Sequence, residues 1–125
     1  MMPQAHPIVG VWEVTAPDAP FPHHVMTFHA DGTMAQSNPD IGNRQTSDSG
    51  GMGIWRADGG EVAGKFVEYT VDRAEPSIVR RGVVEFRMVV AAGEFRGDAA
   101  ATFTQLPDGP VTEPARTSLY GRRLI

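Results

Sequence analysis

Proline and glycine interrupt this chain so regularly that long helices are excluded. The 125 residues include 14 glycines and 10 prolines, and no window of about 12 residues has the apolar spacing of an amphipathic helix. Between these residues run short segments in which apolar and polar side chains alternate, which is typical of half-buried β-strands. The sequence therefore predicts an all-β domain.

Eight alternating segments are predicted as strands. Their approximate bounds are 9–15, 24–30, 33–38, 51–56, 65–71, 79–90, 95–104 and 116–124. Tight connections that contain glycine, such as Asp31-Gly32 and Ala92-Gly93, alternate with longer loops. In an up-and-down meander the tight turns would lie at one end of the strands, and the long loops would surround the other end.

Eight meandering strands are the number that closes into a small barrel, which is either filled by side chains or holds one small ligand. A β-sandwich is the alternative, but sandwiches usually need Greek-key crossings, and no connection here resembles one. We predict that residues 1–125 form a single domain, an eight-stranded antiparallel up-and-down β-barrel.

Alternation also predicts which side chains point inward. The predicted inward sets are Val84, Phe86, Met88 and Val90; Phe95, Gly97, Ala99, Ala101 and Phe103; and His24, Met26 and Phe28. The small residues at 97, 99 and 101 either border a cavity or receive Phe86 or Met88 from the next segment. Glu68 and Glu85 are predicted to be outward, solvated charges.

Composition excludes several classes of partner. The 11 Lys and Arg residues face 15 Asp and Glu residues, so the basic excess of a nucleic-acid binder is absent. Without cysteine there is no disulfide, thiolate nucleophile or sulfur-ligated metal. No apolar stretch approaches the roughly 18–20 residues of a membrane span, and the first residues do not resemble a secretory signal. We expect a cytoplasmic protein.

Two short motifs stand near the start of the first predicted strand and the end of the last, and so at the same end of the predicted barrel. They are Gly-Val-Trp at 10–12 and Gly-Arg-Arg at 121–123. This pair resembles the calycin superfamily, the lipocalins and their small barrel relatives, and segment 27–33 is similar to the second hairpin of small bacterial lipocalin-like domains. In that superfamily the indole packs at the closed end of the barrel beneath an arginine. The resemblance implies structural roles for Gly10, Trp12 and one of Arg122 and Arg123.

The histidines do not predict a metal site, and no cofactor is expected. His23 and His29 share a face but lie about 20 Å apart along an extended strand, and His23 and His24 point to opposite faces. His24 is placed at the long-loop mouth on the inward face. It is either a rim histidine bonded to a loop or, in an enzyme, a general acid/base.

The sequence favours a binding function, in which one small hydrophobic or amphipathic molecule enters through the long-loop mouth. The predicted lining is His24, Met26, Asn38, Met52, Trp55, Tyr69, Met88 and Phe103. The alternative is a cofactor-independent cyclase, isomerase or dehydratase acting on a polyketide-like or terpenoid substrate, with His24 as acid/base and Tyr69 or Asn38 as hydrogen-bond donor. A buried titratable group deep in the cavity would distinguish the enzyme from the binding protein.

A third hypothesis is a filled barrel that serves only as an interaction surface, for example in a homodimer. Such a protein would have no interior pocket and would carry an exposed apolar face.

Overall fold

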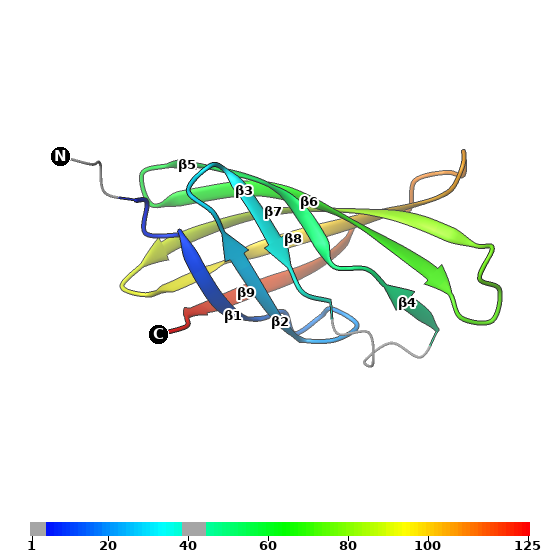
Figure 1. Cartoon of the computed structure of the whole chain (residues 1–125), viewed down its shortest axis with the longest axis horizontal. Helices are drawn as coiled ribbons and strands as arrows, with labels where there is room; N and C mark the ends of the chain where they lie inside the picture. The colour runs from blue at the N-terminus through cyan, green and yellow to red at the C-terminus, as the bar shows by residue number, and fades with distance from the viewer. Residues whose placement is uncertain (1–4, 39–44) are drawn as a thin grey trace.

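Nine antiparallel strands make up the computed structural model, which describes residues 5–38 and 45–125 (Figure 1). They are β1 (Gly10–Thr15), β2 (His23–Phe28), β3 (Thr33–Gln36), β4 (Thr46–Asp48), β5 (Gly51–Asp58), β6 (Glu61–Asp72), β7 (Val79–Ala91), β8 (Glu94–Gln105) and β9 (Ala115–Arg123). Among these residues, no helix is long and apolar enough to cross a bilayer.

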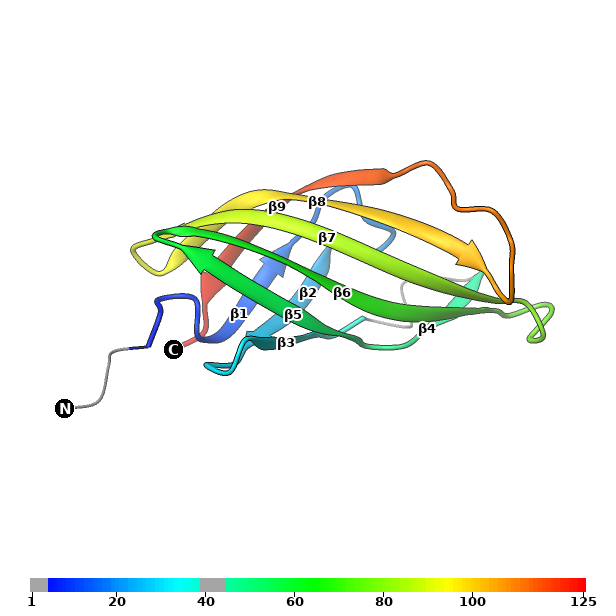
Figure 2. The same cartoon turned by 90° about the horizontal axis from the view of Figure 1, so that it is seen from above.

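Eight of the strands close into a barrel, as predicted (Figure 2). Each pairs with its neighbours in the order β1, β2, β3, β5, β6, β7, β8 and β9, and β9 returns to pair with β1 from Trp12↔Arg123 to Thr15↔Tyr120. The short β4 is an addition within a stretch predicted as loop. It pairs with Thr70–Asp72 at the far end of β6.

Glycine in the left-handed region forms the tight turns. Gly32, Gly59 and Gly93 have φ values of 90°, 60° and 76° in the β2–β3, β5–β6 and β7–β8 connections, a conformation that other residues adopt only with strain. These turns lie at the end of the barrel near both chain termini, and the long β6–β7 and β8–β9 loops lie at the other end (Figure 1). We call these the closed end and the open end.

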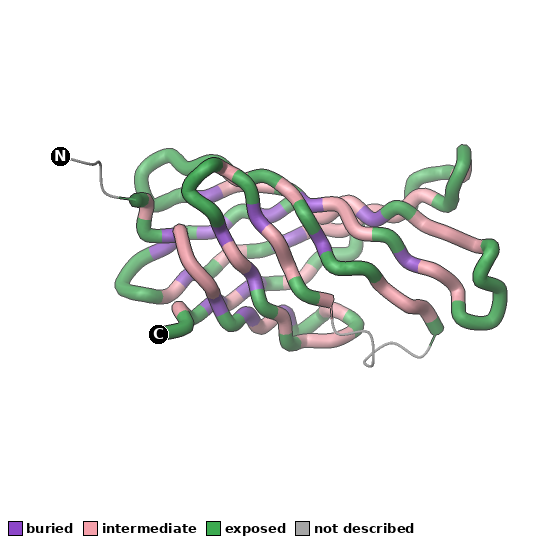
Figure 3. Tube along the Cα trace, in the orientation of Figure 1, coloured by how far each residue is buried: buried purple, intermediate pink, exposed green. Residues whose placement is uncertain are grey.

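Buried and exposed residues alternate along the strands, so one hydrophobic core lies inside the barrel (Figure 3). The inward faces predicted for β2 and β7 are confirmed, since Met26, Phe28, Phe86, Met88 and Val90 are all buried. The largest fully buried side chains are Trp12, Phe28, Phe95, Ile8, Met26 and Val62.

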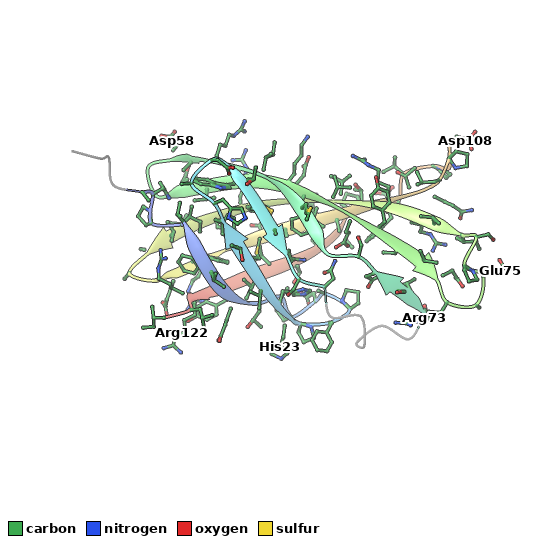
Figure 4. The ribbon with its side chains drawn as sticks, viewed as in Figure 1. His23, Asp58, Arg73, Glu75, Asp108 and Arg122 are labelled. Carbon is green, nitrogen blue, oxygen red and sulfur yellow. The ribbon has the colours of Figure 1, made fainter. Side chains whose placement is uncertain are left out.

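The closed end is held by the arginine–tryptophan pair that the sequence predicted, and Arg123 is the arginine involved. Its guanidinium carbon lies 4.7 Å from the centre of the Trp12 ring, and it donates hydrogen bonds to the carbonyls of Val9 (2.8 Å) and Pro7. Arg122 is exposed and points away from the barrel (Figure 4).

Gly10 makes the approach of Arg123 possible. Its φ is 138°, and a Cβ atom at this position would lie 2.6 Å from Nη1 of Arg123. The indole Nε1 of Trp12 donates to the carbonyl of Ile8 at 2.8 Å. The indole and the guanidinium of this motif thus both donate to backbone carbonyls of residues 7–9, just before β1.

Candidate ligand-binding site

A cavity of about 330 Å³ occupies the open end of the barrel. Its lining comes from every strand except β1 and β5, and from the β1–β2 loop. Two larger hollows, of about 450 and 420 Å³, lie on the outer surface over β5 to β8 and are lined by charged side chains such as Arg56, Arg87 and Asp98. The interior cavity is the candidate site because its lining is mostly apolar and it lies within the barrel.

One wall of the cavity is apolar. It is built by β7, β8 and β9, and its members are Val84, Phe86, Ala99, Ala101, Phe103 and Leu119. The predicted small-residue face of β8 therefore does border a cavity at Ala99 and Ala101. Gly97 does not line it, since a Cβ there would meet the backbone of β7.

The adjoining wall is polar apart from Phe66 and is built by β6, by β4 and by residues at the end of β3. Its members are Gln36, Asn38, Thr46, Asp48, Glu68 and Thr70. The Asn38 amide lies at its centre, where Nδ2 donates to the carbonyl of Ser49 (2.8 Å) and to Oε2 of Glu68. Its Oδ1 accepts a hydrogen bond from Nε2 of Gln36 at 3.2 Å. The amide of Asn38 is therefore occupied by protein partners and acts as a clamp on Glu68.

A bulge between β4 and β5 brings the Ser49 carbonyl to this clamp. Asp48 pairs with Thr70 and Met52 with Val67, so residues 49–51 face only residues 68–69 of β6. The side chain of Ser49 compensates for the irregularity, because its Oγ accepts the backbone N–H of Tyr69 at 2.9 Å. Bulges of this kind re-aim side chains next to functional sites.

Glu68 is a titratable group that lines the cavity, and the prediction that it points outward is wrong. Burial raises the pKa of its carboxyl, the Asn38 hydrogen bond lowers it, and the nearby charge of Asp48 raises it further. Val62, Phe66 and Thr70 are buried on β6, and Glu68 has the same parity. A predicted strand that began at Glu61, where β6 begins, would have placed Glu68 on the inward face with these residues.

Gly82 explains how the Glu68 side chain is desolvated. It pairs with Glu68 on one side and with Phe103 on the other. A Cβ at Gly82 would lie 2.8 Å from the Phe103 ring and 3.1 Å from Cγ of Glu68. The missing side chain thus leaves room for the aromatic ring and the glutamate stem on the inner face of β7.

Four of the eight predicted lining residues border the cavity: His24, Met26, Asn38 and Phe103. His24 lies on the inward face of β2, and its Nδ1 is 3.2 Å from the carbonyl of Ser37. That contact matches the loop-bonded rim histidine considered above. The neighbouring His23 points away from the barrel (Figure 4).

The other four predicted residues lie elsewhere. Met52 and Tyr69 face outward, with 76% and 45% of their surface exposed. Gly51 and Gly53 take the inward positions of β5 and reverse the apparent apolar alternation there, and Tyr69 alternates with the inward Glu68 and Thr70 on β6. Trp55 and Met88 lie toward the closed end. The Trp55 ring is 6.4 Å from that of Phe28, and Met88 is buried in the core.

Charged residues that the sequence did not assign complete the mouth of the cavity. Asp18, Arg80 and Arg116 are among its lining. Of the adjacent arginines in β7, Arg80 lines the cavity and Arg81 is exposed, as expected for neighbours on one strand. Within residues 5–38 and 45–125, no three His, Asp or Glu side chains are grouped so as to hold a metal ion.

Comparisons with models of protein families, with curated proteins and with solved structures found no match to this chain.

Proposed function

We propose that this protein binds one small hydrophobic or amphipathic molecule in the cavity at the open end of the barrel. The observation that carries the proposal is the division of the cavity into an apolar wall and a polar wall around about 330 Å³ of space. Ligand pockets are typically apolar with a few polar groups that fix orientation. A barrel that served only as a scaffold would fill such a space with larger side chains than Ala99 and Ala101.

The same proposal includes a calycin-like origin and a cytoplasmic location. The stacking of Arg123 on Trp12 at the closed end supports the calycin resemblance. Calycin-like barrels bind ligands at the opposite, open end, which is where the cavity lies here.

A cofactor-independent cyclase, isomerase or dehydratase is the second candidate function, and Glu68 is the observation that favours it. A carboxyl with a raised pKa inside an apolar cavity suits general acid/base chemistry. Glu68 takes this role in preference to His24, because the Glu68 carboxyl has a raised pKa and lines the cavity, whereas His24 contacts a loop carbonyl. The phenol of Tyr69 faces solvent and is removed from the candidate site.

Filling the cavity tests the binding function. Neither tryptophan lines the cavity, so binding is followed with N-phenyl-1-naphthylamine, a neutral apolar fluorophore, and by calorimetry. Ala101→Phe should weaken binding by at least about tenfold, which corresponds to about 1.4 kcal/mol. Ala100→Phe is the matched control, since Ala100 points from the same strand toward the outer surface.

Three outcomes decide between the functions. Loss of binding in Ala101→Phe alone supports the cavity. Equal losses in both variants, or no binding to the wild-type protein, would contradict it and favour a surface that only contacts other proteins. If a substrate is found among polyketide-like or terpenoid compounds, loss of turnover with retained binding in Glu68→Gln would identify the enzyme.

A further inference from the structure

Oε1 of Glu68, on the polar wall of the cavity, is positioned to accept a hydrogen bond from a ligand. Asn38 uses both Nδ2 hydrogens and Oδ1 on protein partners. On Glu68 it bonds to Oε2, and no described residue bonds to Oε1. The cavity therefore offers a hydrogen-bond acceptor held in place from one side and left open on the other.

The environment of Glu68 makes its ionised form costly in the empty protein. Burial partly desolvates the side chain and raises the pKa of its carboxyl, and the negative charge of Asp48 raises this pKa further. A bound cation would relieve both effects, because it would replace lost hydration and oppose the repulsion from Asp48. An uncharged ligand would relieve neither effect.

We propose that the cavity selects molecules with an apolar body and a protonated amine, and that the ammonium group binds to Oε1 of Glu68. The inference rests on the proposed binding function and specifies its ligand class. The apolar body would lie against Val84, Ala99, Ala101 and Leu119, and the Phe103 ring beside Glu68 would present its face or edge to the ligand.

Other charged groups of the cavity set the limits of this selectivity. Asp18, His24, Asp48, Arg80 and Arg116 also line it. Arg80 is on the inward face of β7 and pairs with Thr70 of β6. Thr70 is the next inward residue after Glu68 in the direction of the open end. A carboxylate ligand anchored by Arg80 would be the competing arrangement, and the test separates the two.

Three ligands with one alkyl chain provide the test: octylamine, 1-octanol and octanoate. Their affinities for the wild-type protein are measured by calorimetry near neutral pH. We expect octylamine to bind at least about fivefold more tightly than 1-octanol, which is about 1 kcal/mol for a partly desolvated ion pair. Octanoate should be the weakest ligand.

Glu68→Gln tests the residue, and Glu85→Gln is its control, because Glu85 is exposed on the same barrel and pairs with Lys65 across the outer surface. In Glu68→Gln the preference for the amine over the alcohol should disappear, with 1-octanol affinity retained. Glu85→Gln should keep the preference. A retained preference in Glu68→Gln would overturn the inference.

The pH dependence gives a second readout that needs no variant. Octylamine affinity should fall as the pH is lowered through the pKa of Glu68. Because this pKa is raised, the fall should begin at a higher pH than it would for an exposed glutamate. The affinity for 1-octanol should not change over the same pH range. His24→Gln, measured in parallel, separates any contribution of the imidazole. A flat octylamine profile would contradict the role of Glu68.

The outcomes also separate this inference from the function on which it rests. Similar affinities for all three ligands would leave the binding cavity standing and overturn the amine selectivity. Tightest binding of octanoate would identify Arg80 as the anchor and overturn the role of Glu68. No binding by any of the three would contradict the proposed function itself.

Discussion

Each end of the barrel places an aromatic ring beside a charged side chain, but the two arrangements have different roles. At the closed end the Arg123 guanidinium stacks on the Trp12 ring and donates hydrogen bonds to the backbone carbonyls of Val9 and Pro7. At the open end Phe103 also covers a charged group, but Glu68 keeps one oxygen without a partner among the described residues. The first arrangement stabilises the fold, and the second leaves interaction energy available to a ligand.

Removing the indole of the closed end should have the largest effect. Trp12→Ala deletes a fully buried side chain and leaves Arg123 without its stacking partner, so the free energy of unfolding should fall by about 3–5 kcal/mol. Phe103→Ala, at the half-buried open end, should cost less than half as much. Urea denaturation measures both, and equal losses would contradict the division of roles between the ends.

The arginine pair sharpens the comparison within the closed end. Arg123→Met removes hydrogen bonds to Val9 and Pro7 and the contact with Trp12, which should cost about 1–3 kcal/mol. Arg122→Met, one residue away and exposed, should change stability by less than about 0.5 kcal/mol. If the two variants were equally stable, Arg123 would have no special role in closing the barrel.

Glu68 should give a smaller and pH-dependent effect. Its folded-state pKa is raised, so the folded protein holds the proton more tightly than the unfolded chain does. Its contribution to stability is therefore fully present below the unfolded pKa and is lost as the pH rises through the folded pKa. Glu68→Gln should be more stable than wild type at neutral pH, and the difference should vanish in acid. A variant less stable than wild type at neutral pH would contradict this sign.

The outer surface should give the smallest effect. Met52 was predicted inside the cavity but is 76% exposed, so Met52→Ser should change stability by less than about 0.5 kcal/mol and leave ligand affinity unaltered. Met26→Ser, on the buried inner face, is the matched comparison and should impair both. Weaker ligand binding in Met52→Ser would require the ligand to contact the outer face of β5.

The barrel was predictable because the spacing of the turns and the alternation in the strands both indicated an up-and-down meander. Glycines at the tight turns indicated the meander, and the alternation of large apolar with charged residues in β7 and β8 indicated their inward faces. The order of strands then followed, because every strand of a closed barrel is paired on both edges. The added strand β4 is the exception. The closed-end pair followed from a motif, although only the structure distinguishes Arg123 from Arg122.

The candidate site was predictable only in part, because its key positions break the alternation rule. Inward glycines at 51 and 53 left Met52 as the larger apolar side chain on the wrong face. Inward polar residues on β6 made Glu68 resemble a surface charge. In both places the sequence departs from the pattern of a filled core, and these departures are where the cavity and its polar wall are built.

The pairing of β9 with β1 has a consequence for how the chain is made. These strands stand near opposite ends of the sequence, so the barrel cannot close during translation until β9 has left the ribosome. Until then the edge of β1 is unpaired and Trp12 lacks the guanidinium that covers it. The nascent barrel is therefore most prone to aggregation in the interval before β9 emerges and pairs with β1.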